Sequence, residues 1–398
     1  MTNVFVVSAA RTAIGNFGGS LKDCAPCVLG AQVTRAAMER ASVEPSVIGH
    51  VVFGQVVPTA PEDAYLARVS AVNAGIPVET PALTVNRLCG SGLQAIVSAA
   101  QAIMLGDCDV AIGGGAEVMS RAPHIVPAAR FGQKMGDAVC IDMLTGALTD
   151  PFHKVHMGIT AENVAERYQV SRTDQDALAL QSQLRAATAI AAGMFKDQIV
   201  PIEVKSKGKL VSFDTDEFVR RNAKAEDFAA LKPIFKRDGS VTAGNASGIN
   251  DGAAAVVLAS EAAVKKYGLK PLARLVAYAH AGVDPAYMGI GPVPATRKAL
   301  ARAGLTIKDI DVIEANEAFA AQACAVSREL GFDPAKVNPN GSGISLGHPV
   351  GATGAIITTK LIYEMQRTGA RYGLVTMCIG GGQGIAAIFE SQRPEVAK

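Results

Sequence analysis

The sequence has no tryptophan, and aromatic residues make up only 5% of its 398 positions. Alanine and glycine supply much of the remaining small, apolar content, which favours tightly packed helices and close backbone approaches over a bulky aromatic core. No apolar run approaches the roughly 18 residues that cross a bilayer, and the N-terminus begins with a strand-like stretch, residues 4–8, rather than a signal segment. We therefore expect a soluble, cytoplasmic protein with no membrane partner.

An excess of either charge is also missing, since 38 lysines and arginines accompany 36 aspartates and glutamates, a net charge of +2. This balance argues against nucleic acid as the main partner, although local basic residues could still bind a phosphate-bearing ligand. The seven cysteines form an odd, thinly spread set in a chain without an export signal. Free and mostly buried thiols are therefore expected instead of a disulfide framework.

The chain is too long for one ordinary hydrophobic core, so we expect two or three folding units. Its two halves share one order of elements: a helix, a strand, a VN…GSG turn, a second helix, and a strand that ends in a run of glycines. The turn reads VNRLCGSG in the first half and VNPNGSG in the second. Two copies of one αβ unit predict two similar layered α/β domains about a pseudo-dyad, with sheets covered by helices.

A segment of different character, residues 119–244, separates the repeats. It contains the charged, turn-rich stretch KSKGKLVSFDTDEFVRRNAKAEDF and a more polar helical stretch at residues 160–192. Long excursions of this kind usually carry ligand contacts. We interpret the segment as an inserted loop domain.

Cys89 is the first candidate for chemistry, because it lies between a predicted strand at residues 82–86 and a helix that opens at Gly90-Ser91-Gly92. A thiol at a helix N-terminus experiences the positive end of the dipole and unpaired N–H groups, both of which favour the thiolate. A cysteine taken alone is more often a buried structural residue. The strand–cysteine–glycine–helix setting makes a nucleophile an equally good hypothesis.

The same segment supports a rival interpretation, because residues 90–95 satisfy the dinucleotide fingerprint G-x-G-x-x-A after a strand. That motif needs an acidic residue at the end of the next strand. Asp107 and Asp109 instead precede that strand, which is predicted to end at Gly113-Gly114-Gly115. An NAD-dependent dehydrogenase is therefore the weaker alternative.

Two further patterns suggest chemistry without the context that it needs. Cys24-Ala-Pro-Cys27 is spaced like a redox dithiol, but no strand precedes it and no second pair completes a zinc site, so we interpret both as helix-facing cysteines. His153 and His156 lack a nearby carboxylate or cysteine set. The sequence therefore predicts no metal site.

Three side chains of the second half extend the candidate site. His348 lies in GHPVGATG just before a helix, in a loop held by glycines and a proline, and no P-loop lysine accompanies it. Cys378 follows a predicted strand at residues 372–377, at the strand end where open αβ sheets expose their working residues. Asn316 ends another strand of this half and places an amide at the matching level.

Together these motifs resemble the thiolase family. VNRLCGSGLQA, NEAFA, GHPVGATGA and CIGGGQG occur in the family's order, with GNASGINDGAAA between them, so the resemblance covers essentially the whole chain. It is nearest to short-chain biosynthetic enzymes, the acetyl-CoA acetyltransferases and β-ketothiolases. It implies two βαβαβαββ domains in a five-layered αβαβα core, residues 1–118 with 245–269 and residues 270–398. It also implies the inserted loop domain at 119–244 and a homotetramer built as a dimer of dimers.

The resemblance implies a reversible Claisen condensation of two acetyl-CoA to acetoacetyl-CoA and CoA, and thiolysis of short 3-ketoacyl-CoA, with no metal and no cofactor beyond the coenzyme A thioester. Cys89 would take the acyl group, His348 would activate that thiol, and Cys378 would remove the α-proton of the second acetyl-CoA. Asn316 would orient a water that completes one oxyanion site with His348. The N–H groups of Cys89 and Gly380 would form the other. Enolate attack on an acylated thiol needs one nucleophilic sulfur, one base and two sets of aimed donors.

The resemblance also implies a set of coenzyme A contacts. Met157 and Met288 would close the acyl end of the pocket and favour short acyl groups, although methionine is adaptable enough for slightly longer chains. Relatives often carry serine where this chain has Asp227, so Asp227 is left out of the set. The matching positions are Leu148, His156, Met157, Arg220, Phe235, Ala243, Ser247, Met288, Ala318 and Phe319.

Other members of this fold class fit the sequence less well. A ketoacyl synthase typically pairs its cysteine with two histidines, whereas the third partner here is Cys378. A lipid-carrier thiolase usually has histidine where this chain has Asn316. A non-catalytic acyl-CoA-binding or lipid-binding thiolase-like protein would not need both thiols and His348.

Overall fold

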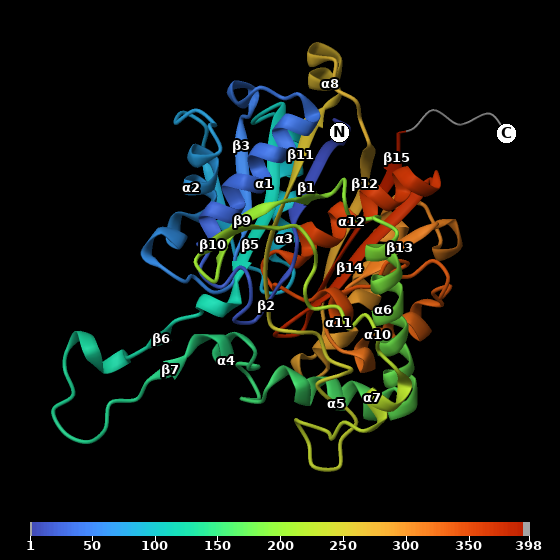
Figure 1. The fold of residues 1–398 in the computed structure, drawn as a ribbon. Helices are drawn as coiled ribbons and strands as arrows, with labels where there is room; N and C mark the ends of the chain where they lie inside the picture. The colour runs from blue at the N-terminus through green and yellow to red at the C-terminus, as the bar shows by residue number, and fades with distance from the viewer. Residues whose placement is uncertain (1, 393–398) are drawn as a thin grey trace.

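Two copies of one strand arrangement form the central 11-stranded sheet of the computed structural model, which describes residues 2–392 (Figure 1). The N-terminal half, read from its outer edge, contains β4 (Ala82–Val85), β3 (His50–Gly54), β5 (Val110–Val118), β11 (Asn250–Ser260) and β1 (Val4–Thr12). The C-terminal half, read the same way, contains β13 (Val312–Ala315), β14 (Tyr372–Ile379), β15 (Gln383–Ser391) and β12 (Ala273–Gly282).

The strand directions repeat as well as the order. In each half the strands at the outer edge pair in parallel. The two pairings nearest the middle of the sheet are antiparallel, β5 with β11 and β11 with β1 in one half, and β14 with β15 and β15 with β12 in the other. A parallel bridge between Ile313 and Val337 lies beside β13, where the other half has β4. Within the sheet formed by the described residues, the halves meet where β1 pairs with β12, at Phe5–Arg274 and Val6–Ala273. The repeat predicted from the sequence is therefore confirmed.

Helices cover both halves of the sheet and complete a layered αβαβα core (Figure 1). The short helix α8 (Glu261–Tyr267) follows β11, and α11 (Gly343–Leu346) precedes the last helix. The outer helices are α1 (Pro26–Ala41) and α2 (Leu66–Asn73) on the N-terminal half, and α9 (Pro292–Ala303) and α10 (Ala320–Leu330) on the other. The central helices, which pack on each other, are α3 (Ser91–Leu105) and α12 (Thr353–Thr368).

One expectation about apolar runs is wrong. Among the described residues, the stretch Leu88–Leu105 is long and apolar enough, by length and composition, to cross a membrane. It forms the N-terminal turn and the whole of α3, and 61% of it is buried inside the protein, against β3, β5 and α12. Its apolar character is that of a helix covered on several sides by the core.

The inserted segment is a mixture of short elements. The predicted helical stretch at residues 160–192 is divided into two helices. One ends at Arg167 and the next begins at Arg172, where Ser171 and Asp174 form a capping box. The elements are β6 (His124–Ile125), β7 (Ile141–Asp142), α4 (Met143–Ala147), α5 (Met157–Arg167), α6 (Arg172–Ala191), β8 (Ile199–Val200), β9 (Ile202–Ser206), β10 (Lys209–Phe213) and α7 (Ala225–Ala229).

A buried ion pair fastens this segment to the first strand. Arg11 donates to both carboxylate oxygens of Asp216 at 2.8 and 2.9 Å, and neither side chain is exposed. Asp216 also accepts the backbone N–H of Ile14 at 2.8 Å. The charges are thus paired and hydrogen-bonded, as burial requires. Near this point β2 (Gly15–Asn16) adds to β11.

Glycines set the distance between the central layers. The run Gly113-Gly114-Gly115 lies inside β5 and not at its predicted end. Glycine is needed at position 113 because a Cβ there would lie 2.5 Å from the Cα of Ile96 in α3. A Cβ at Gly354 would lie 2.2 Å from the backbone N of Leu93, so α3 and α12 touch through their backbones near their N-termini. This contact brings the two predicted motifs, around Cys89 and His348, to one place.

Gly354→Ala should therefore destabilise the protein, since the added methyl group cannot fit without separating α3 from α12. Overpacking of this kind costs about 1–3 kcal/mol, which a lower urea midpoint of unfolding would report. Gly146→Ala is the control, because a Cβ there meets nothing within 4 Å. Equal midpoints for the two variants would contradict the close crossing.

Candidate active site

A cavity of about 490 Å³ lies where the two halves and the inserted segment meet. Cys89, His348 and Gly380 line its inner end, so the structure brings these predicted site residues together. Cys378 and Asn316 do not line it and are buried. All ten residues predicted to contact coenzyme A line the same cavity: Leu148, His156, Met157, Arg220, Phe235, Ala243, Ser247, Met288, Ala318 and Phe319.

The turn between β4 and α3 presents Cys89. Leu88 has a φ of +45°, a left-handed conformation that is strained for a leucine. The hydroxyl of Ser91 holds the turn, because it accepts the N–H of Arg87 at 2.8 Å and donates to the carbonyl of Leu88 at 2.6 Å. Asn86 accepts the N–H of Leu88 at 2.9 Å. The half-buried Cys89 therefore reaches the cavity from a fixed backbone.

The N–H groups expected to favour the thiolate of Cys89 do lower its pKa, but burial outweighs them in the resting protein. Desolvation by the surrounding protein raises the pKa of Cys89, and the backbone N–H groups of Gly380 and Cys89 itself lower it by less. The buried carboxylate of Glu117 adds a further upward contribution. A thiol that is protonated at rest needs a base before it can act as a nucleophile.

His348 has the properties of that base. Burial lowers its pKa to about 4, so the imidazole is neutral at physiological pH. Its Nδ1 lies 2.6 Å from the hydroxyl of Thr353, which itself donates to the carbonyl of Pro349 at 2.9 Å. The hydroxyl of Thr353 has one proton and gives it to Pro349, so toward His348 it can only accept a hydrogen bond. We therefore infer that Nδ1 carries the imidazole proton and that Nε2 can accept a proton.

The second thiol lies behind the first. Cys378 is the penultimate residue of β14 and not the residue after the strand, which corrects the predicted strand end by two residues. It is fully buried, and its pKa is raised by desolvation and by the charge of Cys89. Gly380, two residues after Cys378, presents its backbone N–H to the Cys89 sulfur and lines the cavity beside it, so the two thiols belong to one site.

Asn316 reaches the same site from the neighbouring strand. It follows β13, which runs parallel to β14, and its backbone N–H donates to the carbonyl of Thr376 at 3.0 Å. Its Nδ2 lies 3.3 Å from Nε2 of His348, and its Oδ1 has no hydrogen-bond partner among the described residues. The two strand ends thus lie at one edge of the sheet, as expected from their parallel pairing.

Aromatic rings and a positive charge form the outer part of the cavity. His156 stacks on Phe235 with ring centroids 4.7 Å apart, and Phe319 meets Phe235 edge-on at 6.2 Å. Burial lowers the pKa of His156, and its Nδ1 accepts the N–H of Gly158 at 3.0 Å. The exposed Arg220 provides a cationic group. An apolar wall with few polar groups is typical of a binding site for an elongated organic ligand.

The sequence did not reveal one buried acid of this site. Glu117, near the end of β5, accepts the backbone N–H groups of Val56, Val57 and Gly351 at 2.8, 3.1 and 2.8 Å. Burial raises its pKa to about 7. Its carboxylate is fully occupied in joining loops of the two halves, so it cannot hold a ribose as a dinucleotide site would require. Its place after the glycine run was the available signal.

Several apolar residues of the wall were also missed, because an isolated apolar residue in a sequence gives no sign that it faces a ligand. They include Val56, Met119, Phe218, Ile249 and Val350.

Among residues 2–392, no group of three or more histidine, cysteine, aspartate or glutamate side chains is placed to hold a metal ion. Cys27 lies on α1, whereas Cys24 lies just before the helix, and both are free.

A layered αβαβα fold in which a thiol and an imidazole line an apolar cavity, with a second thiol buried nearby, is typical of a class of cysteine-dependent enzymes. Residues 4–262 match the family model of the thiolase N-terminal domain, and residues 269–391 match that of the thiolase C-terminal domain. The chain belongs to the thiolase family.

Named relatives cover nearly the whole chain. Beta-ketothiolase BktB of Cupriavidus necator is 67% identical over 97% of this chain and 98% of its own, and an acetyl-CoA acetyltransferase of Chromobacterium violaceum is 54% identical over 97% and 99%. The crystal structure of human mitochondrial 3-ketoacyl-CoA thiolase in complex with CoA superposes with a TM-score of 0.96 at 48% identity, covering 98% of each chain. The Bacillus anthracis acetyl-CoA acetyltransferase also has a TM-score of 0.96, at 47% identity over 98% and 99%.

The hydrogen-bond pattern predicts the charge and tautomer of His348. Because its pKa is lowered to about 4, the ring should stay neutral from pH 8 to 5 and gain a proton only near pH 4, with Nδ1 protonated above that. Nitrogen NMR of histidine-labelled protein would show both, with His348→Asn assigning the signals. A protonation midpoint near the ordinary value of about 6.5 would contradict the assignment of a buried neutral base.

Proposed function

We propose that this protein is an acetyl-CoA acetyltransferase and short-chain β-ketothiolase, which condenses two acetyl-CoA to acetoacetyl-CoA and CoA and cleaves short 3-ketoacyl-CoA in reverse. The observation that carries the proposal is that Cys89 and His348 line the cavity whose wall contains all ten predicted coenzyme A contacts, while the buried thiol of Cys378 lies two residues before Gly380 of the same cavity. The names of the relatives point to the same reaction.

The first half-reaction transfers the acetyl group to the protein. His348 Nε2 accepts the proton of Cys89, and the thiolate attacks the carbonyl carbon of acetyl-CoA. The N–H groups of Cys89 and Gly380, both of which stabilise negative charge at the Cys89 sulfur, would also stabilise the tetrahedral oxyanion. The carbon–sulfur bond to coenzyme A then breaks, and the departing thiolate takes the proton of Cys378.

The second half-reaction forms the carbon–carbon bond. Acetylation removes the charge of Cys89 that raises the pKa of Cys378, and burial still makes the Cys378 thiolate a strong base. That thiolate takes an α-proton of a second acetyl-CoA, and the protonated His348, with a water oriented by Asn316, would stabilise the enolate oxygen. The enolate attacks acetyl-Cys89, acetoacetyl-CoA is released, and Cys89 recovers its proton from His348. All three groups return to their starting states, and no metal or further cofactor enters the proposal.

The acyl end of the cavity favours small groups. Met157 lies close to Gly380, since a Cβ at Gly380 would be 3.0 Å from the Met157 methyl carbon. Met288 is buried at the same cavity. We therefore propose short acyl chains as substrates, and side-by-side thiolysis of acetoacetyl-CoA and longer 3-ketoacyl-CoA would measure the range.

The alternatives have less support. The dehydrogenase lacks its acidic residue, since Asp107 and Asp109 precede β5 and Glu117 is occupied, and NAD binding would test it directly. A non-catalytic acyl-CoA-binding protein would not need two coupled thiols beside a neutral imidazole.

The family matches divide the chain between residues 262 and 269, and we keep the insert at 119–244 as a proposal. The free state of all seven cysteines supports a reducing compartment such as the cytoplasm.

Variants of the two thiols should separate the half-reactions. Cys89→Ala should abolish both acetyl transfer and condensation. Cys378→Ala should slow condensation by roughly two to four orders of magnitude, as for other acid–base groups, while a pulse of labelled acetyl-CoA still acetylates Cys89. Mass spectrometry of the protein and steady-state rates supply the measurements. Absence of an acetyl adduct on Cys89 in the wild type would contradict the proposed function.

We also propose a homotetramer, for which the hairpin around β6 and β7 gives support. It extends from the body of the molecule (Figure 1), and Phe131, Met135 and Val139 on it are 91%, 86% and 64% exposed. Apolar side chains displayed in this way usually mark an interface. A second copy of the chain is the partner that the resemblance suggests.

Replacing Phe131 and Met135 together by aspartate should weaken assembly, because each charge would have to be buried in the interface. Light scattering should give a mass near four chains for the wild type and a smaller one for the double variant. Leu210→Asp, at a position 65% exposed on β10, is the control and should keep the wild-type mass. An unchanged mass in the double variant would exclude the hairpin from the interface.

A further inference from the structure

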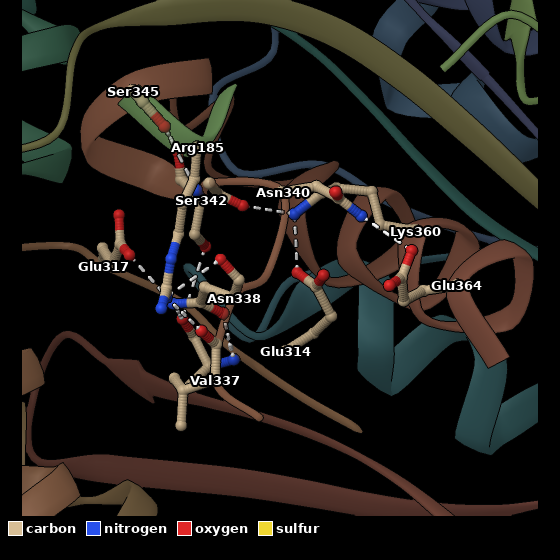
Figure 2. A network of polar contacts seen from close by, with 12 residues as sticks. Arg185, Glu314, Glu317, Val337, Asn338, Asn340, Ser342, Ser345, Lys360 and Glu364 are labelled. Atoms are coloured by element: carbon tan, nitrogen blue, oxygen red, sulfur yellow. Dashed lines mark hydrogen bonds and ion pairs between the residues drawn. The ribbon is translucent and has the colours of Figure 1, made fainter. Parts of the chain in front are cut away.

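A network of polar side chains, drawn in Figure 2, includes Glu317, the residue after Asn316, and the side chains labelled there do not line the cavity. Its centre is Glu317, which is 4% exposed and whose pKa is raised by that burial. One carboxylate oxygen accepts the hydroxyl of Ser182 at 2.6 Å, and the other accepts the amide of Asn338 at 2.9 Å. The carboxylate of the residue after Asn316 is therefore fixed from two sides.

Asn338 also fixes the residue before Asn316. Its Oδ1 accepts the backbone N–H of Ala315 at 2.9 Å, and its Nδ2 donates to the carbonyl of Ala315 at 2.8 Å. Asn338 itself has a φ of +45° and is 3% exposed, so the packing holds it in a strained conformation. Together with Glu317 it fixes the chain on both sides of Asn316.

The network continues to the segment that carries His348. The backbone N–H of Ile344 in α11 lies 3.4 Å from the Glu317 carboxylate, and the hydroxyl of Ser345 lies 2.8 Å from that of Ser182. His348 follows α11 after Gly347. Ser182 belongs to α6 of the inserted segment, so three distant parts of the chain meet at one carboxylate.

The side chain of Asn316 has little support of its own. Its one hydrogen-bonding contact among the described residues is at 3.3 Å to His348, and its oxygen has no hydrogen-bond partner there. Its direction is therefore determined by its backbone and by the residues on either side. An error in that direction would move the group proposed to stabilise the enolate, and would leave Cys89 and its oxyanion donors in place.

We propose that Glu317 and Asn338 are positioning residues that align Asn316 with His348 for the enolate half of the reaction. The proposal rests on the proposed function. Glutamate is needed because its carboxylate accepts Ser182, Asn338 and Ile344 at once, whereas glutamine at this position turns an N–H group toward one of these donors. The buried ammonium of Lys360, paired with Glu314 at 2.7 Å, lowers the cost of the charge.

The test compares Glu317→Gln with the wild-type protein in three measurements. These are the acetylation of Cys89 by a pulse of acetyl-CoA, the exchange of acetyl-CoA α-protons in D₂O, and the steady-state condensation rate. We expect exchange and condensation to fall by about 10- to 100-fold, the order of effect that an ångström of misplacement produces. Acetylation should change by less than about threefold, and the KM for CoA in thiolysis should stay near the wild-type value.

Glu364→Gln is the matched control. Glu364 is also a buried glutamate in Figure 2, and accepts the amide of Asn340 at 2.8 Å, but it contacts neither Ala315 nor Ser182. It should leave the ratio of α-proton exchange to acetylation unchanged. An equal fall of acetylation and exchange in Glu317→Gln, wild-type exchange in it, or the same loss in the control would each overturn the proposal.

Ser182→Ala is the second variant, should Glu317→Gln fail to fold. It removes one donor to the carboxylate without introducing a new one, and we expect a loss of exchange of about 3- to 10-fold with normal acetylation. Failure of both variants to fold would assign the network to stability alone and overturn the proposal. If the wild type itself neither acetylates Cys89 nor exchanges α-protons, the proposed function fails instead.

Discussion

The backbone contact between α3 and α12 is the constraint on which the candidate site depends. Gly92 and Gly354 allow the two central helices to touch without side chains between them. Cys89 lies two residues before α3, and His348 lies five residues before α12, so the crossing of the two core helices brings both groups to one cavity. The separation of nucleophile and base is thus a property of core packing, which tolerates little change in volume.

Burial then determines the charge state of the groups that the crossing brings together. The same desolvation raises the pKa of Cys89 and Cys378 and lowers that of His348, so each is neutral at rest. Charge appears only when a proton moves from a thiol to the imidazole. Acetylation of Cys89 then removes the charge that most directly opposes ionisation of Cys378. In this scheme the order of the two half-reactions follows from electrostatics.

The sequence was informative where a motif repeats and where a residue type has one main use. The repeat predicted the two halves of the sheet, and the resemblance placed Cys89, His348 and the ten wall residues in one cavity. The sequence could not show whether the helix dipole or desolvation has the larger effect on the pKa of Cys89, because burial is a property of the whole fold. Glu117 and Glu317 were missed for a related reason, because a glutamate in a sequence is most often solvated.

These two carboxylates show how a repeated fold holds a single loop. Glu117 in the N-terminal half accepts the N–H of Gly351, on the C-terminal side of His348. Glu317 in the other half contacts the N–H of Ile344, on its N-terminal side. The loop between α11 and α12 is therefore held at both ends by buried acids from the two halves. A change in Glu117 would act on the loop after His348, whereas a change in Glu317 would act mainly through Asn316, and neither carboxylate lines the cavity.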